Sequence, residues 1–301
     1  MKGKIIILFI LSCCVFDHVR GQEYQFEKNG IMFRVIQDPT EAAIMGKVNV
    51  TANQDNPYEG SIVIPAGITD GNEKNADRYS VVGIDDRAFS NCSGLTSVKL
   101  PISVEHIGKF AFEGCNNLRT VEIPYGKMKT IDEYAFYESG IETISIPSCI
   151  RKIEESAFCS CPKLREVNFS DGLTTIGDGA FYYCPSLKQV ELPNTLKKLA
   201  NNAFSKCEHL EIVVLPETLK SIGESAFFQC ERLSTITIPP SVVFIGDDAF
   251  SCCTSLNLIV NKSTHINLTS EKEKNRIFCS RGLFGCKNMI DNVKIVDDSK
   301  Q

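Results

Sequence analysis

Residues 175–193 read TIGDGAFYYCPSLKQVELP, and this stretch recurs with few changes along most of the chain. Its Ala-Phe pair returns eight times, and successive phenylalanines are 22–24 residues apart. They are Phe89, Phe112, Phe136, Phe158, Phe181, Phe204, Phe227 and Phe250. A period in the twenties is typical of a solenoid, in which each turn of the chain buries its apolar face against the next. The 301 residues therefore predict one elongated stack rather than two globular domains.

Each repeat also contains a segment that predicts a β-strand. In the copy at residues 175–193 the apolar residues are Leu187, Val190 and Leu192, and the last two point to one side of a strand. Pro193 follows directly and ends the strand, because proline donates no backbone hydrogen bond. Strands from successive repeats would then pair side by side. An Ile-Gly pair before several of the Ala-Phe turns completes the frame, and one Phe per repeat predicts a stacked column of rings.

A few repeats depart from this frame. Ser139 replaces the usual cysteine, Ser170 stands where proline is expected, and Leu199 with Ala200 replaces Ile-Gly. We interpret these changes as local irregularities of the stack.

The frame Ile-Gly-x-x-Ala-Phe-x-x-Cys-x-x-Leu-x-x-Val-x-Ile-Pro resembles the BspA-like class of leucine-rich repeat, found in bacterial and protist surface proteins. The resemblance extends over about residues 60–296. It implies a repeat solenoid of the α/β leucine-rich type, mostly β with short turns and about 23 residues per coil. It further implies a curved, right-handed stack with a concave parallel sheet and a cap at each end, used in adhesion and protein binding.

The first 21 residues have the basic start and short apolar run of a secretory signal peptide, with cleavage expected before Gln22. We therefore expect a secreted or cell-surface protein; the alternatives are a periplasmic location or a lipid anchor on Cys13 or Cys14. No second apolar run reaches the ~18 residues of a membrane span. Loss of the signal removes three cations and one acid and takes the net charge from −5 to −7, which disfavours nucleic acid as a partner.

The two ends of the chain differ from the regular repeats. Asn29-Gly30 is a hairpin signal, so residues 22–60 predict a small β cap before a solenoid over residues 61–260. Residues 261–282 predict an inserted, solvated loop that contains the charged run at 271–274. Residues 283–301 predict a degraded final repeat and cap, in which Phe284 begins the repeat and Val293 and Ile295 take the Val190 and Leu192 positions.

The cysteines form a column of their own. Seven occupy one repeat position: Cys92, Cys115, Cys161, Cys184, Cys207, Cys230 and Cys253. Stacked equivalents would lie about 4.8 Å apart with parallel Cβ vectors, which does not suit a disulfide. We predict buried free thiols that pack in a ladder and bond the turn backbone. Five other cysteines remain after signal removal, at 149, 159, 252, 279 and 286, and Cys279 with Cys286 is the expected bond in the final cap.

The chain lacks the motifs that carry chemistry. No Gly-x-Ser-x-Gly, His-Glu-x-x-His or phosphate-binding glycine loop is present, and no Cys-x-x-Cys pair suggests zinc. Acid pairs such as Glu154-Glu155 and Asp247-Asp248 are interpreted as solvating the turn before Ala-Phe. We predict no enzyme activity, no catalytic residues, no metal and no cofactor.

The variable strand positions are the candidate binding residues. The residues two and four places after the repeat leucine point out of the predicted sheet, and they are polar in the first five full repeats. The last three have β-branched or apolar residues there instead: Ile212, Val214, Thr235, Thr237, Leu258 and Val260. Exposed apolar surface of this kind marks binding sites. The predicted partner is a protein on a host or neighbouring-cell surface or in the matrix; the alternative function is a structural or envelope-assembly module with no external ligand.

Overall fold

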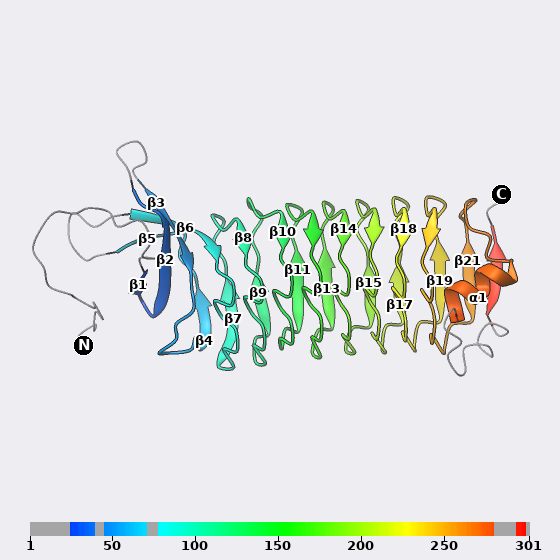
Figure 1. Ribbon diagram of the computed structural model, residues 1–301, viewed down its shortest axis with the longest axis horizontal. Coiled ribbons are helices and arrows are strands. Elements are labelled where there is room, and N and C mark those ends of the chain that lie inside the picture. The colour runs from blue at the N-terminus through cyan, green and yellow to red at the C-terminus, as the bar shows by residue number, and fades with distance from the viewer. Residues whose placement is uncertain (1–24, 40–44, 71–77, 280–292, 299–301) are drawn as a thin grey trace, which may run out of the picture.

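The computed structural model describes residues 25–39, 45–70, 78–279 and 293–298. Repeats stack along one axis, and each contributes one longer and one shorter strand to two rows of parallel strands (Figure 1). The architecture is mostly β, with parallel sheets and one helix among the described residues. The predicted signal sequence at 1–21 lies outside the described residues.

The first row is called the long-strand face. Its parallel strands occur in three sheets, β4 to β13, β15 with β17, and β19 to β22, and β13 lies beside β15 and β17 beside β19. Their bounds are β4 (Gly60–Val63), β7 (Leu95–Lys99), β9 (Thr120–Glu122), β11 (Thr143–Ile146), β13 (Glu166–Phe169), β15 (Gln189–Glu191), β17 (Ile212–Val214), β19 (Thr235–Ile238), β21 (Leu258–Asn261) and β22 (Lys294–Asp297). The repeat leucine and valine positions are buried beneath it, as the spacing predicts.

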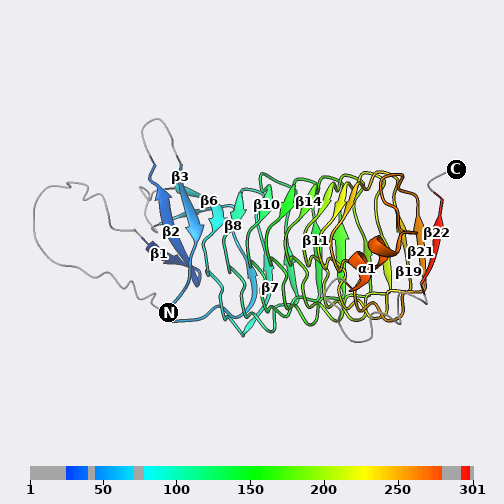
Figure 2. The same cartoon turned by 45° about the vertical axis from the view of Figure 1, so that its right-hand side comes forward.

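The second row, called the short-strand face, was not predicted from the sequence. It contains β8 (His106–Ile107), β10 (Thr130–Ile131), β12 (Lys152–Ile153), β14 (Thr175–Ile176), β16 (Lys198–Leu199), β18 (Ser221–Ile222) and β20 (Phe244–Ile245). These strands end on the isoleucine or leucine of the Ile-Gly position, which is buried in every one (Figure 2 shows the row from a second side). Each is only two residues long, too short for alternation to reveal it in the sequence.

The predicted column of phenylalanine rings is confirmed. All eight rings are fully buried, and neighbours stack with centroids 4.9–5.9 Å apart and interplanar angles of at most 9°. This separation follows from the strand spacing of about 4.8 Å, because one ring is contributed per repeat. The Phe column is thus the continuous centre of the core.

The Ala-Phe turn has a backbone feature that the sequence does not reveal. In every repeat, the residues two before and two after the phenylalanine have positive φ, and only Gly179 and Gly114 among them are glycines. The phenylalanine N–H donates to the alanine carbonyl of the next repeat, as from Phe181 to Ala203 at 2.8 Å. The residues at positive φ donate in the same direction, as from Gly179 to Asn201 at 2.8 Å. These bonds between repeats hold a conformation that non-glycine residues otherwise avoid.

The cysteine column forms the predicted ladder. Each thiol after the first regular turn donates to the carbonyl of the phenylalanine one repeat earlier, as from Cys184 to Phe158 at 3.2 Å and from Cys207 to Phe181 at 3.2 Å. Ser139 keeps this position polar and lies 3.5 Å from the Cys161 sulfur. Cys92, Cys115, Cys161, Cys184, Cys207 and Cys230 are free and buried. The expected Cys279–Cys286 bond stays a prediction, because Cys286 lies outside the described residues.

The ladder predicts a specific reactivity. We expect the column thiols to resist a water-soluble alkylating agent in the folded protein and to react once guanidinium unfolds it, without added reductant. Burial raises the pKa of Cys115 and Cys207 to about 12, so the reactive thiolate is scarce at neutral pH. Mass spectrometry of alkylated protein measures this directly. Two or fewer labelled thiols after unfolding without reductant would contradict the free ladder.

The region predicted as the N-terminal cap, called the cap below, contains a sheet of β1 (Gln25–Lys28), β2 (Ile31–Gln37), β3 (Gly46–Val50), β5 (Gly67–Thr69) and β6 (Arg78–Ile84). The hairpin forms at Asn29-Gly30, where both residues have positive φ. The predicted boundary at residue 60 does not separate cap from solenoid in space, because β5 and β6 follow it and complete the cap sheet. β6 also pairs with β8, so the cap continues directly into the short-strand row.

A buried polar group ties the cap to the first repeat. Asp85 accepts two hydrogen bonds from the Arg34 guanidinium at 2.5 and 2.6 Å and a third from the Asn49 amide at 2.7 Å. The Asn49 Nδ2 also lies 3.2 Å from His106 Nε2. Asp85 and Asn49 are buried, so these hydrogen bonds replace contacts that the polar groups would otherwise make with water.

The C-terminal end corrects two predictions. The charged run at 271–274 begins a helix, α1 (Glu271–Cys279), rather than a solvated loop. Its acids lie in the first turn and Arg276 in the last, which suits the helix dipole. Ile277 and Phe278 are buried, and the Ile277 carbonyl accepts from the Phe250 N–H at 3.0 Å, so Ile277-Phe278 takes the place of the next Ala-Phe pair. Phe284, predicted for that role, lies outside the described residues.

The register of the last strand also differs from the prediction. Ile259 pairs with Ile295, whereas the predicted frame placed Val293 opposite it. The slip is two residues, so the same side of the strand still faces inward. Once the insertion departs from the repeat length, spacing alone no longer determines the register.

Candidate interaction surface

The six predicted binding residues lie on neighbouring strands of the long-strand face. Ile212 and Val214 are on β17, Thr235 and Thr237 on β19, and Leu258 and Val260 on β21. The register pairs Thr235 with Leu258 and Thr237 with Val260. Because β17 lies beside β19, the structure brings all six together on one surface, which we call the apolar patch.

Exposure differs along the apolar patch. Ile212 and Val214 are 54% and 49% exposed, so alternate positions of one strand present aliphatic surface to solvent. Leu258 and Val260 are half-buried. In register with Ile212 and Val214, the preceding strand β15 has Gln189 and Glu191. The change from polar to apolar surface predicted from the sequence therefore occurs between two adjacent strands.

One further residue belongs to the apolar patch. Val296 of β22 pairs with Val260, and it is half-buried like its partner. The sequence frame missed it because it assigned the last strand a register two residues away. The sequence offered one signal for this residue, the adjacent apolar pair Ile295 and Val296 near the end of a repeat-like segment. Without the pairing of β21 with β22, that signal did not show which of the two side chains faces outward.

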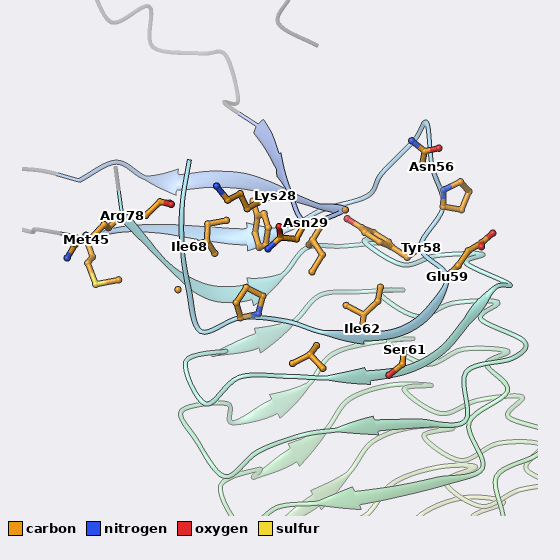
Figure 3. Close-up of a pocket in the computed structure, with 18 residues that line it drawn as sticks. Lys28, Asn29, Met45, Asn56, Tyr58, Glu59, Ser61, Ile62, Ile68 and Arg78 are labelled. Carbon is orange, nitrogen blue, oxygen red and sulfur yellow. The ribbon is translucent and has the colours of Figure 1, made fainter. Parts of the chain in front are cut away.

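A separate pocket lies at the N-terminal end and was not predicted. Figure 3 shows it between the β1–β2 hairpin and β4, with Tyr58 and Ile62 on its walls and Lys28 and Arg78 on the cap side. Its volume is about 820 Å³, within the range of small-molecule sites. Its apolar lining is mostly aliphatic, and the deeper residues Ile31, Phe33 and Tyr58 are buried.

Several titratable groups in the described part of the chain are held in ion pairs or buried in turns. The Lys152 ammonium lies beside the Glu154 carboxylate, and Asp247 forms an ion pair with Arg276 at 3.0 Å. Asp248 is buried in the turn, so the expectation that the whole acid pair solvates this turn was wrong for that residue. Within the residues described, no cluster of three or more His, Cys, Asp or Glu side chains has metal-binding geometry. Those same residues include no helix of the length and apolarity that a bilayer crossing requires.

The repeats match the family described as BspA type Leucine rich repeat region (6 copies), over residues 82–211 and 174–274. Together these ranges cover more than half of the chain. The chain belongs to the BspA-type leucine-rich repeat family. The BspA-type region includes all eight Ala-Phe turns, and it includes the apolar patch as far as β21.

Solved structures agree with this assignment. A leucine-rich repeat protein of T. pallidum is 28% identical, with a TM-score of 0.55, and the match covers 66% of this chain and 87% of that one. A leucine-rich repeat protein from Bacteroides ovatus is 24% identical, with a TM-score of 0.54, and the match covers 87% and 77% of the two chains. The second likeness supports the fold alone. No curated protein matches this sequence.

Proposed function

We propose that this protein is a secreted or cell-surface module that binds a protein partner through the apolar patch on its long-strand face, without turning it over. The observation that carries the proposal is the exposure of Ile212 and Val214 on a strand whose neighbour presents Gln189 and Glu191 in the same columns. Leucine-rich repeat membership favours an interaction module, and the signal-like first residues favour export.

The physical basis is removal of aliphatic surface from water. Burying an exposed aliphatic side chain contributes about 1.5–3 kcal/mol, and the rigid sheet beneath holds these side chains in place before the partner arrives. The polar strands β7 to β15 would form the rim, where contacts give orientation more than affinity. We retain the expectation of a curved right-handed stack, with this sheet on the concave side and a cap at each end.

The test begins with capture of a partner from candidate cells or matrix by the mature chain, followed by affinity measurements with that partner. The double variant Val214→Asp, Val260→Asp should weaken binding by about 100-fold or more, because each charge must be desolvated in the interface. Circular dichroism should show an intact fold, since both side chains point out of the sheet.

The matched control is Ser145→Asp, Asn168→Asp, which adds the same charge to the same face on the polar strands β11 and β13. Its affinity should change by less than about tenfold. Equal losses in the two variants would show that charge on the face matters and the apolar patch does not. Unchanged affinity in the first variant would exclude the patch.

A further inference from the structure

The short-strand face carries an unbalanced row of cations, here called the cationic stripe. Its members are Lys129, Arg151, Lys197, Lys198 and Lys220, and all five are exposed. Lys129, Arg151, Lys197 and Lys220 occupy one column of repeats, as the backbone bonds show: Arg151 N–H donates to Lys129 O at 2.7 Å, and Lys220 N–H to Lys197 O at 2.8 Å. Thr174 fills the column between Arg151 and Lys197. Figure 1 shows the short strands of this row aligned along the stack.

Several charges elsewhere in the described residues pair with an opposite charge on the neighbouring repeat. Arg87 pairs with Glu113 at 2.6 Å, Lys109 with Glu133 at 2.8 Å, and Lys99 with Glu122 at 2.8 Å, each across one repeat. Such cross-strand pairs of opposite charge stabilise a sheet, and like charges placed opposite each other destabilise it. Within the described residues, none of the five stripe cations has an acidic side chain within ion-pair distance.

The stripe is therefore a local excess of positive charge in a chain that is acidic overall. Its neighbour Lys152 is neutralised by Glu154, and the acids Glu133 and Glu155 lie beyond it at the turn before Ala-Phe. Arg151 uses one guanidinium nitrogen on the Gly172 carbonyl at 2.9 Å, which fixes its position on the face. Repulsion along the column would be relieved by an external anion that runs parallel to the stack.

We propose that the cationic stripe binds a linear anionic polysaccharide whose sulfate or carboxylate groups lie along the column of repeats. A row of cations on successive repeats, interrupted once by Thr174, suits a chain that carries many anions along its length, and Arg and Lys both bind such oxyanions strongly. Nucleic acid is disfavoured because no aromatic side chain lies among the stripe residues for base stacking; the exposed Phe244 follows at the end of the row. This second face is distinct from the apolar patch and its protein partner.

The probe is heparin, immobilised and measured by surface plasmon resonance near ~0.15 M ionic strength. The variant Lys129→Ser, Lys197→Ser, Lys198→Ser, Lys220→Ser should bind about 50- to 100-fold more weakly and show a shallower dependence on salt, because fewer counterions are released. The matched control Lys99→Ser, Lys163→Ser, Lys188→Ser, Lys262→Ser loses the same charge from other exposed sites and should weaken binding by less than about fivefold.

Several outcomes would overturn the proposal. They are an absence of heparin binding by the unaltered chain, equal losses in the two lysine variants, or tighter binding of polyglutamate or single-stranded DNA than of heparin at matched charge. Retention of heparin binding by the Val214→Asp, Val260→Asp variant supports it and shows that the two faces act separately. Circular dichroism of both lysine variants should show the fold of the unaltered chain, because all the altered side chains are exposed.

Discussion

Replacing Phe181 with alanine should lower the free energy of unfolding by about 3–5 kcal/mol. The ring is fully buried near the middle of the stack, with centroids 5.1 Å from those of Phe158 and Phe204 on either side. Its removal opens a cavity that the repeats cannot close, because the strands and turns on both sides are held at their spacing by hydrogen bonds. It also removes two ring stacks, each worth about 0.5–1.5 kcal/mol beyond burial.

Urea denaturation followed by circular dichroism measures this loss. A solenoid is stabilised chiefly by contacts between neighbouring repeats, so a weakened central interface should also broaden the transition or divide it in two. The control is Tyr183→Ala, which removes an aromatic ring from the same turn where it is 44% exposed. A loss below about 1 kcal/mol for Phe181→Ala would mean that the Phe column is not the main source of cohesion.

Replacing Arg34 with methionine should cost a similar amount, about 3–5 kcal/mol, because it leaves the buried Asp85 carboxylate without its cation. Arg34 keeps most of its side chain out of water, with 27% exposed, and Asp85 is nearly enclosed at 10%. The Asn49 amide alone cannot compensate for the charge, although it would still donate at 2.7 Å. Since Arg34 is on β2 and Asp85 follows β6, the damage should begin at the cap.

The double variant Arg34→Met, Asp85→Leu separates two contributions to the lost stability. One is the attraction between Arg34 and Asp85, and the other is the cost of leaving the Asp85 carboxylate buried without a cation. Removing both partners should recover more than half of the stability lost by Arg34→Met, because no uncompensated carboxylate remains buried. Hydrogen exchange should show faster opening of β1 to β3 in the single variant while the central repeats stay protected. If the single and double variants are equally unstable, the pair acts through packing rather than charge.

Much of the fold follows from residues that recur at a constant step. Phe181, Cys184, Leu187 and Val190 have equivalents at the same spacing in other repeats, so the spacing alone predicts their burial and column order. The candidate surface was predictable for the same reason, because Val214 occupies a strand position whose direction follows from that of Val213. The short strands and the positive-φ turns were not predictable, since each involves one or two residues of variable type.

The ends of the chain mark the limit of spacing arguments. Phe278 packs beside Phe250, and Ile295 rather than Val293 lies beside Ile259. The register error arose where the insertion is not a whole repeat, and there helix formation and burial of Ile277 and Phe278 were not predictable from spacing. Val296 joined the apolar patch only through that alignment.

By itself, the sequence determined the repeating unit, the buried Phe and Cys columns and the side of each strand that faces outward. The columns recur once per repeat, and the outward-facing side chains recur every second residue along a strand, so both can be read from spacing. Only the tertiary structure decided which charges share a column, how the cap joins the first repeat and where the last strand pairs. Those features depend on contacts between residues at irregular separations. The unbalanced cations of the short-strand face became visible only when the repeats were stacked, because charge balance is a property of neighbours in space.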